Sequence, residues 1–184
     1  MLNYNFFKSQ NDSKQLLVML HGFISDSTTY DSHIEQLSQH VNVLTIDLPG
    51  HGKDTSDMND TWDFPYIAHA LDEVLSQYDM YDVYLLGYSM GGRVALYYAL
   101  NGSVALRGLL LESTSAGIQS EADKVERVQV DAARAKVLEI AGLEIFVNDW
   151  EKLPLFRSQY ELDAEVRKAI RANRMSQNLS LIHI

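Results

Sequence analysis

The strongest constraint on the fold is one serine held between two glycines, where an apolar run changes into a helical pattern. Residues 85–100 read LLGYSMGGRVALYYAL, and Ser89 is the centre of a Gly-x-Ser-x-Gly motif. A strand-like run precedes the motif directly and an amphipathic stretch follows it directly. Such a turn strains its central residue, so the positions two residues before and two residues after it must lack side chains. The pattern predicts that Ser89 is a nucleophile, exposed at the carboxyl end of a strand.

A second motif predicts donors for a negatively charged oxygen near this serine. His21, Gly22 and Phe23 follow the apolar run LLVML. We expect the backbone N–H groups of Phe23 and Met90 to converge on one oxygen, where each donor contributes about 3 kcal/mol to transition-state stabilisation. A third motif, DLPGHG at 47–52, closes the next apolar run, and alone it indicates no more than a tight loop.

The rest of the first 115 residues alternates strand-like and helical segments, which is typical of a mostly parallel sheet. NYNFF near the start is consistent with an edge strand. The other predicted strands cover 16–20, 41–46, 83–88 and 106–113, and the predicted helices cover 30–40, 64–78 and 90–100.

After residue 115 the pattern becomes wholly helical. We predict helices at about 121–140, 143–150 and 163–175, with KLPLF between the last two. This arrangement favours a helical cap that follows the sheet over a second independent domain. The predicted organisation is therefore a core at 1–115, a cap at 116–178 and a tail at 179–184.

Composition narrows the possible partners and the compartment. The chain has 184 residues, of which 46% are hydrophobic, and this suits one soluble globular domain. A formal charge of −10 argues against nucleic acid or an anionic membrane surface as partner. The chain has no cysteine, no signal-peptide pattern and no membrane-spanning stretch, which favours a cytoplasmic protein. The oligomeric state stays open.

The three motifs, in this order and spacing, resemble the α/β-hydrolase superfamily over most of residues 15–115. The resemblance implies an α/β-hydrolase fold with a mostly parallel sheet, helices on both faces and a helical cap. The family within this superfamily is indicated by two segments, ESTSAGI and FVNDWEKLPLF, together with Arg93 and Arg127. They resemble the 2-succinyl-6-hydroxy-2,4-cyclohexadiene-1-carboxylate synthase family of menaquinone biosynthesis, from about Leu16 to Met175.

This family resemblance implies a lyase that eliminates pyruvate from 2-succinyl-5-enolpyruvyl-6-hydroxy-3-cyclohexene-1-carboxylate, without a metal or a cofactor. Such a substrate carries three carboxylates, which planar and permanently charged arginines suit. Carried over by motif, Ser89 is the catalytic serine, and Phe23 and Met90 form the oxyanion hole for the developing enolate. The resemblance also assigns four residues to the substrate pocket: Tyr88, Arg93, Arg127 and Trp150.

Each pocket residue also has a purely structural interpretation. Arg127 lies four residues from both Asp123 and Asp131, a spacing that suits ion pairs on one helix. Trp150 could belong to the core of the cap. Tyr88 could pack at the end of its strand, and Arg93 could cap a loop.

The sequence lacks an evident base for the serine. In this superfamily an Asp or Glu and then a His follow the cap, but His183 is the only histidine after Ser89. It lies in LSLIHI at 179–184, which we predict to be a non-native tail. We therefore expect a chain that is truncated before its last strands and inactive as it stands. A serine esterase or thioesterase and a triad-deficient, non-catalytic protein remain the alternatives, and carboxylate-binding arginines facing Ser89 would favour the lyase.

Overall fold

The computed structural model describes residues 1–180, which form two compact units. The first unit contains Met1–Gly117, and the second begins at Ile118. The end of the predicted tail, including His183, lies outside the described residues.

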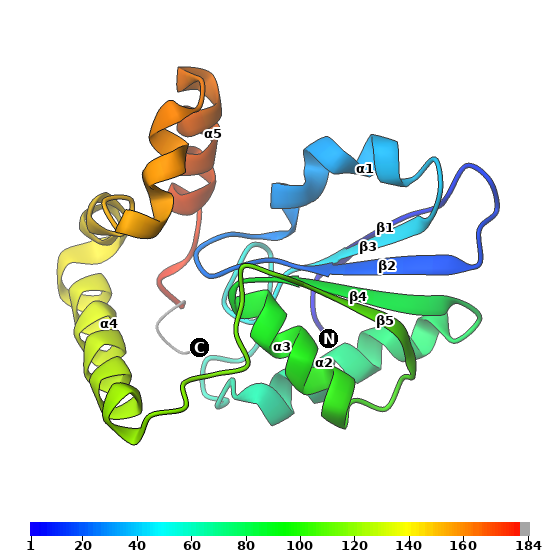
Figure 1. The fold of residues 1–184 in the computed structure, drawn as a ribbon, viewed down its shortest axis with the longest axis horizontal. Helices are drawn as coiled ribbons and strands as arrows, with labels where there is room; N and C mark the ends of the chain where they lie inside the picture. Colours follow the sequence, from blue (N-terminus) through cyan, green and yellow to red (C-terminus); the bar gives the residue numbers. More distant parts are fainter. Residues whose placement is uncertain (181–184) are drawn as a thin grey trace. The chain divides into compact units, whose positions relative to one another are not determined.

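A five-stranded sheet forms the centre of the first unit (Figure 1). Its order is β1-β3-β2-β4-β5, and only β1 runs antiparallel to its neighbour, β3. All five strands match the sequence prediction, including the edge strand near the N-terminus. Their bounds are β1 (Tyr4–Phe7), β2 (Gln15–Leu20), β3 (Asn42–Ile46), β4 (Asp82–Tyr88) and β5 (Leu106–Glu112).

Helices lie on both faces of this sheet, as Figure 1 shows: α1 (Asp31–Leu37) covers one face, and α2 (Phe64–Leu75) and α3 (Met90–Asn101) cover the other. A parallel sheet needs cover on both faces, which explains why every residue of β3 is buried. The α/β-hydrolase fold class predicted from the motifs is thus confirmed for this unit.

The predicted helices differ from the observed ones mainly around α1. The segment before it forms a short 3-10 helix, η1 (Ser27–Tyr30), whose N-terminus is capped by the Asp26 side chain accepting from the Thr28 N–H. Helix α1 ends at Leu37, where the carbonyl of that residue accepts from the N–H groups of His40 and Val41. Helix α2 continues into a second 3-10 turn, η2 (Ser76–Tyr78), so this segment ends where the sequence predicts.

Strand β5 forms one margin of the sheet. Among the described residues it pairs only with β4. Leu110 and Leu111 are each 45% exposed, although the run LRGLLLE is as apolar as a covered strand. Part of an apolar strand therefore faces solvent in these 180 residues.

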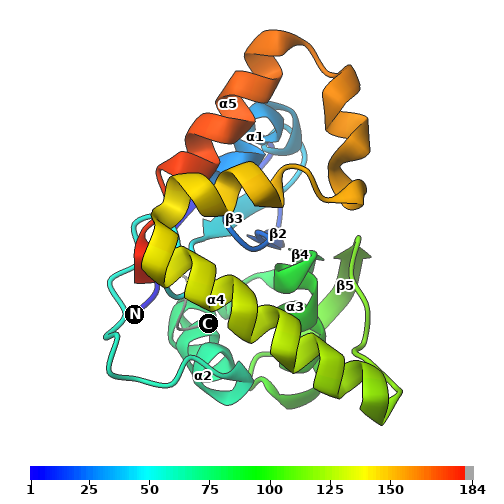
Figure 2. The same cartoon turned by 90° about the vertical axis from the view of Figure 1, so that its left-hand side faces the viewer.

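The second unit is helical. Helix α4 (Glu121–Trp150) changes direction at Gly142, whose φ of 80° breaks the helix, and Figure 2 shows this bend. The two predicted helices at 121–140 and 143–150 are therefore the two arms of α4. A 3-10 segment, η3 (Pro154–Glu161), leads to α5 (Ala164–Met175). Within residues 1–180, no helix is long and apolar enough to span a bilayer.

Candidate active site

Ser89 lies at the turn between β4 and α3 with a φ of 53° and a ψ of −112°. A non-glycine residue held in this region costs about 1–3 kcal/mol, so surrounding contacts must maintain it. The Ser89 N–H donates to the carbonyl oxygen of Glu112 over 2.9 Å, and the Thr114 hydroxyl donates to the Ser89 carbonyl oxygen over 2.7 Å. The predicted strained strand-to-helix turn is confirmed, and residues at and just after the end of β5 hold it.

Backbone crowding explains the two glycines of the motif. An ideal Cβ on Gly87 would lie 2.3 Å from the carbonyl oxygen of Gly91. One on Gly91 would lie 2.3 Å from the carbonyl oxygen of Leu20 and 2.5 Å from that of His21. Helix α3 therefore begins against the end of β2, and only glycines allow the approach.

The segment after β2, where Phe23 lies, runs beside the serine. An ideal Cβ on Gly22 would lie 3.4 Å from the Cβ of Ser89 and 3.0 Å from the Tyr88 ring. Ile24 has a φ of 56°, so the segment turns sharply after Phe23. Met90 opens α3, and the N–H of a first helical residue has no partner within its helix. Both proposed donors thus come from backbone next to Ser89.

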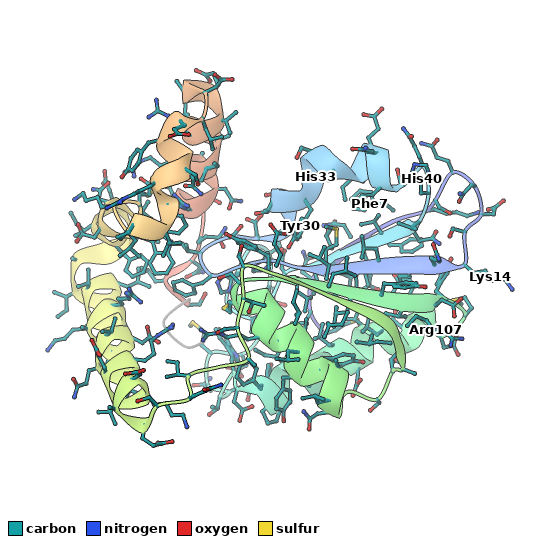
Figure 3. The ribbon with its side chains drawn as sticks, viewed as in Figure 1. Phe7, Lys14, Tyr30, His33, His40 and Arg107 are labelled. Carbon is teal, nitrogen blue, oxygen red and sulfur yellow. The ribbon has the colours of Figure 1, made fainter. Side chains whose placement is uncertain are left out.

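Tyr30 holds the C-terminal end of β2, where this segment begins. Its ring is buried with Met19 and Val43, and its hydroxyl donates to the Leu20 carbonyl oxygen over 3.0 Å. Figure 3 labels Tyr30 between α1 and the sheet. Burial raises the pKa of this phenol, and the nearby Glu112 adds to that effect. A neutral, donating tyrosine is therefore part of the support of the site.

Two histidines of the motifs HGF and DLPGHG are buried beside the same segment. His21 and His51 are 0% and 1% exposed, and their ring centroids lie 5.1 Å apart. The Leu48 N–H donates to Nε2 of His21 over 3.0 Å, and the Ile24 N–H donates to Nε2 of His51 over 3.3 Å. The motifs HGF and DLPGHG placed both residues near the site, but only the fold reveals their mutual contact.

The DLPGHG segment is anchored by its first residue. Asp47 is 2% exposed, and its carboxylate accepts from the backbone N–H groups of Ser27 and Lys53 and from the Asn3 amide. Gly52 has a φ of 56°, and an ideal Cβ there would lie 2.6 Å from the Asp47 carboxylate. The segment is therefore a rigid turn that carries His51, which is more than the tight loop expected from sequence.

Two of the proposed substrate-binding residues lie in the same unit as the serine. Tyr88 is half-buried at the end of β4, with its ring close to Gly22. Arg93 is half-buried in the first turn of α3, and its backbone N–H donates to the Ser89 carbonyl over 3.3 Å. Arg107, by contrast, pairs with Asp82 near the start of β5, at the opposite end of the strands (Figure 3).

The other two proposed substrate-binding residues lie in the helical unit, where each has structural partners. Nε of Arg127 donates to Asp131 over 2.6 Å, the ion pair that the spacing allows. The Trp150 ring stacks on Phe146 at 5.6 Å, and the Arg134 guanidinium lies 5.4 Å from its centroid. These contacts agree with the structural interpretations of both residues. They do not test the proposed binding roles.

The helical unit also contains a groove of about 310 Å³ that the sequence prediction missed. Glu151 at its wall accepts from Arg171 over 2.7 Å and from Arg174 over 3.1 Å. Four of the nine lining residues are basic and all four lie on α5, which the sequence shows as an arginine-rich helix. The lining residues are Glu151, Phe156, Gln159, Tyr160, Arg167, Lys168, Ile170, Arg171 and Arg174.

No group of three or more His, Asp or Glu side chains within residues 1–180 is arranged to hold a metal ion.

Comparison with known proteins agrees with this geometry. A family model described as the alpha/beta hydrolase family matches residues 17–179. The chain belongs to the alpha/beta hydrolase family. Its fold also matches an esterase from Thermogutta terrifontis, at 23% identity and a TM-score of 0.81, over 99% of this chain and 64% of that one.

More similar relatives support the narrower resemblance. The structure of MenH from S. aureus matches with 55% identity and a TM-score of 0.97, over 100% of this chain and 69% of that chain. The 2-succinyl-6-hydroxy-2,4-cyclohexadiene-1-carboxylate synthase of Salmonella agona is 36% identical over 162 residues, 88% of this chain and 62% of that protein. The resemblance inferred from the motifs is thus confirmed. The chain spans about three fifths of the length of the curated relatives it matches.

Proposed function

We propose that this chain belongs to a lyase that eliminates pyruvate from 2-succinyl-5-enolpyruvyl-6-hydroxy-3-cyclohexene-1-carboxylate in menaquinone biosynthesis. The observation that carries the proposal is the 55% identity to MenH across the whole chain, with Ser89 held in the strained turn that its chemistry needs. The cysteine-free composition supports a reaction in the cytoplasm.

In the proposed reaction a proton leaves the carbon next to the succinyl ketone, and the ketone oxygen takes up negative charge as an enolate. As the enolate reforms the ketone, a double bond forms between C2 and C3, the ring double bond moves from C3–C4 to C4–C5, and the carbon–oxygen bond at C5 breaks. The enolpyruvyl group leaves as the enolate of pyruvate, which takes up a proton to give pyruvate. The N–H groups of Phe23 and Met90 stabilise the enolate oxygen, and the start of α3 adds a favourable dipole. The Ser89 oxygen accepts the proton from that carbon, after a base on the complete protein has taken up the hydroxyl proton.

We further propose that Tyr88, Arg93, Arg127 and Trp150 bind the substrate, with the two arginines holding carboxylates. The half-burial of Arg93 close to Ser89 supports its role, because a partly desolvated guanidinium binds a carboxylate more strongly than an exposed one. For Arg127, the proposal requires the substrate to compete with Asp131 for the same guanidinium.

The test is a chain extended with the C-terminal segment of the S. aureus MenH, which we call the extended chain. Purified extended chain is mixed with the enolpyruvyl substrate, and pyruvate is followed by its enzymatic reduction with NADH. We expect turnover that falls at least about 10³-fold in Ser89→Ala, the scale seen when the activated group of a catalytic unit is removed.

Two other outcomes would each select an alternative. Ser89-dependent hydrolysis of a neutral ester without pyruvate release would identify an esterase. If a folded extended chain showed neither activity, the non-catalytic interpretation would hold.

A further inference from the structure

We propose that His21 and His51 act as positioning residues, which lock the segment carrying Phe23 to the DLPGHG turn through two neutral imidazoles. The proposal rests on the proposed function, because it gives that segment a role in binding the reacting oxygen. It adds one requirement to that function. His21 and His51 must each be in a single tautomer, although neither side chain touches the substrate.

The hydrogen bonds define the tautomer of each ring. A backbone N–H points at Nε2 of each histidine, from Leu48 for His21 and from Ile24 for His51. Each Nε2 must therefore be an unprotonated acceptor. Each Nδ1 lies near a carbonyl oxygen, 2.8 Å from that of Gly22 and 2.9 Å from that of Pro49, so it must carry the proton.

These bonds cross between two segments that are distant in sequence. His21 lies in the segment after β2 and binds Leu48 after β3, whereas His51 lies after β3 and binds Ile24 after β2. The connection is reciprocal, and the two rings lie 5.1 Å apart. The edge of the His51 ring also meets the Phe23 ring at 5.7 Å. The peptide units on both sides of Phe23 are thereby held.

The surroundings keep both imidazoles neutral. Burial lowers the pKa of His21, although the hydrogen bond to Gly22 and the charges of Asp47 and Asp26 oppose that shift. Burial, with a contribution from His21, lowers the pKa of His51 to about 3, against the opposing effects of the hydrogen bond to Pro49 and of Asp26. Protonation at either Nε2 would place an N–H against a backbone N–H and break the connection.

This arrangement also excludes both histidines as the base for Ser89. A general base needs an unprotonated nitrogen within reach of the hydroxyl, and the Nε2 of each ring already accepts from the backbone. His21 and His51 therefore hold the segment that carries one proposed oxyanion donor, and another group must take up the proton from Ser89.

The experiment compares His51→Gln with His51→Asn in the extended chain. The longer glutamine can place its amide oxygen where Nε2 accepts from Ile24, whereas the shorter asparagine reaches only the Nδ1 position beside Pro49. We expect His51→Gln to keep kcat within about threefold, and His51→Asn to lower kcat by about 10- to 100-fold, part of the effect of one oxyanion donor. KM should change little in either variant.

Thermal melts of both variants separate positioning from folding. Equal kcat values for the two variants at a temperature where both are folded would overturn the proposal, as would a change confined to KM. If the unsubstituted extended chain releases no pyruvate, the proposed lyase function fails. The same comparison is then made on Ser89-dependent hydrolysis of p-nitrophenyl acetate, which uses the same oxyanion donors.

A spectroscopic measurement tests the tautomers independently of any activity. In ¹⁵N-labelled extended chain, long-range imidazole spectra should show both rings neutral with the proton on Nδ1 at pH 7 and still at pH 5. The exposed His33 and His69 serve as internal controls for the spectra of rings that are accessible to solvent. An Nε2–H tautomer or a charged ring for His21 or His51 at pH 5 would contradict the proposal, even if His51→Asn failed to fold.

Discussion

The hydroxyl of Thr114 donates a 2.7 Å hydrogen bond to the carbonyl oxygen of Ser89. The Ser89 N–H donates in turn to the carbonyl oxygen of Glu112, so both backbone groups of the strained residue bind the segment at the end of β5. The methyl group of Thr114 also lies near Gly92, where an ideal Cβ would be only 2.5 Å from it. The conformation of the serine is thus maintained from a neighbouring strand.

Thr114→Val should remove this support while keeping the side-chain shape. We expect a loss of about 1 kcal/mol in the free energy of unfolding, the usual net value of one hydrogen bond. We also expect kcat of the extended chain to fall by more than KM changes, because Ser89 loses a constraint on its backbone. Urea unfolding and pyruvate release measure the two effects. Thr114→Ser keeps the hydroxyl, and if it matched Thr114→Val in kcat the hydrogen bond would not be the cause.

The fold could be predicted largely because its signals are local. Strands β2 and β3 are short apolar runs bounded by polar turns, and Gly142 divides α4 where the helical pattern breaks in the sequence. The turn at Ser89 was predictable for the same reason, since strand, glycines, serine and helix are contiguous.

The supports of the site could not be predicted, because they join residues that are distant in sequence. Thr114 and Ser89 form a hydrogen bond although they lie 25 positions apart in the sequence, and His51 and Ile24 do so at a separation of 27 positions. Period and composition carry no information on such pairings. The pairing of Arg127 with Asp131 follows from helical spacing, but spacing alone also allowed Asp123.

Arg127→Ala and Arg93→Ala in the extended chain should each weaken use of the tricarboxylate substrate by about 2–3 kcal/mol in kcat/KM, the scale of a lost charge-assisted contact. The free energy of unfolding should change by less than about 0.5 kcal/mol for Arg127→Ala, because its ion pair with Asp131 is largely exposed. Steady-state kinetics and urea melts provide the two measurements.

Lys124→Ala is the matched control, since Lys124 forms a similar exposed ion pair with Glu121 on the same helix. It should leave kcat/KM unchanged. If Arg127→Ala lowered ester hydrolysis and pyruvate release equally, Arg127 would be structural. Asp131→Asn should not weaken substrate use, because it removes a competitor for the Arg127 guanidinium.

Asp72 joins α2 to the end of α3 and should add a pH-dependent contribution to stability. Its carboxylate accepts from the Tyr98 hydroxyl over 2.6 Å and from the backbone N–H and hydroxyl of Ser103. Burial alone would raise the pKa of Asp72, but these hydrogen bonds bring it below the ordinary value of 3.8. The stabilisation is therefore present above about pH 4 and is lost as pH falls through the lowered pKa.

Asp72→Asn should accordingly reduce the free energy of unfolding by about 1 kcal/mol at pH 7, since a charge-assisted hydrogen bond becomes a neutral one. The difference from the unsubstituted chain should shrink as the pH falls below about 4, because the stabilisation by the charged carboxylate is then progressively lost. Urea melts at pH 3, 5 and 7 measure it. The control is Asp79→Asn, at an exposed position just after η2, which should change the free energy of unfolding at pH 7 by less than about 0.5 kcal/mol. A constant difference at all three values would contradict the assignment.

The 184-residue chain should release pyruvate at least about 10³-fold more slowly than the extended chain, because we expect the base that activates Ser89 to come from the C-terminal segment that the extended chain adds. His21 and His51 already accept backbone hydrogen bonds at Nε2. Within residues 1–180, Leu110 and Leu111 are also half exposed on a strand paired on one side only, and such edges promote aggregation. We therefore expect a less cooperative thermal melt and more light scattering than in the extended chain. Turnover with a sharp melt in the 184-residue chain would contradict both expectations, and a His183→Ala variant would then show whether His183 supplies the base.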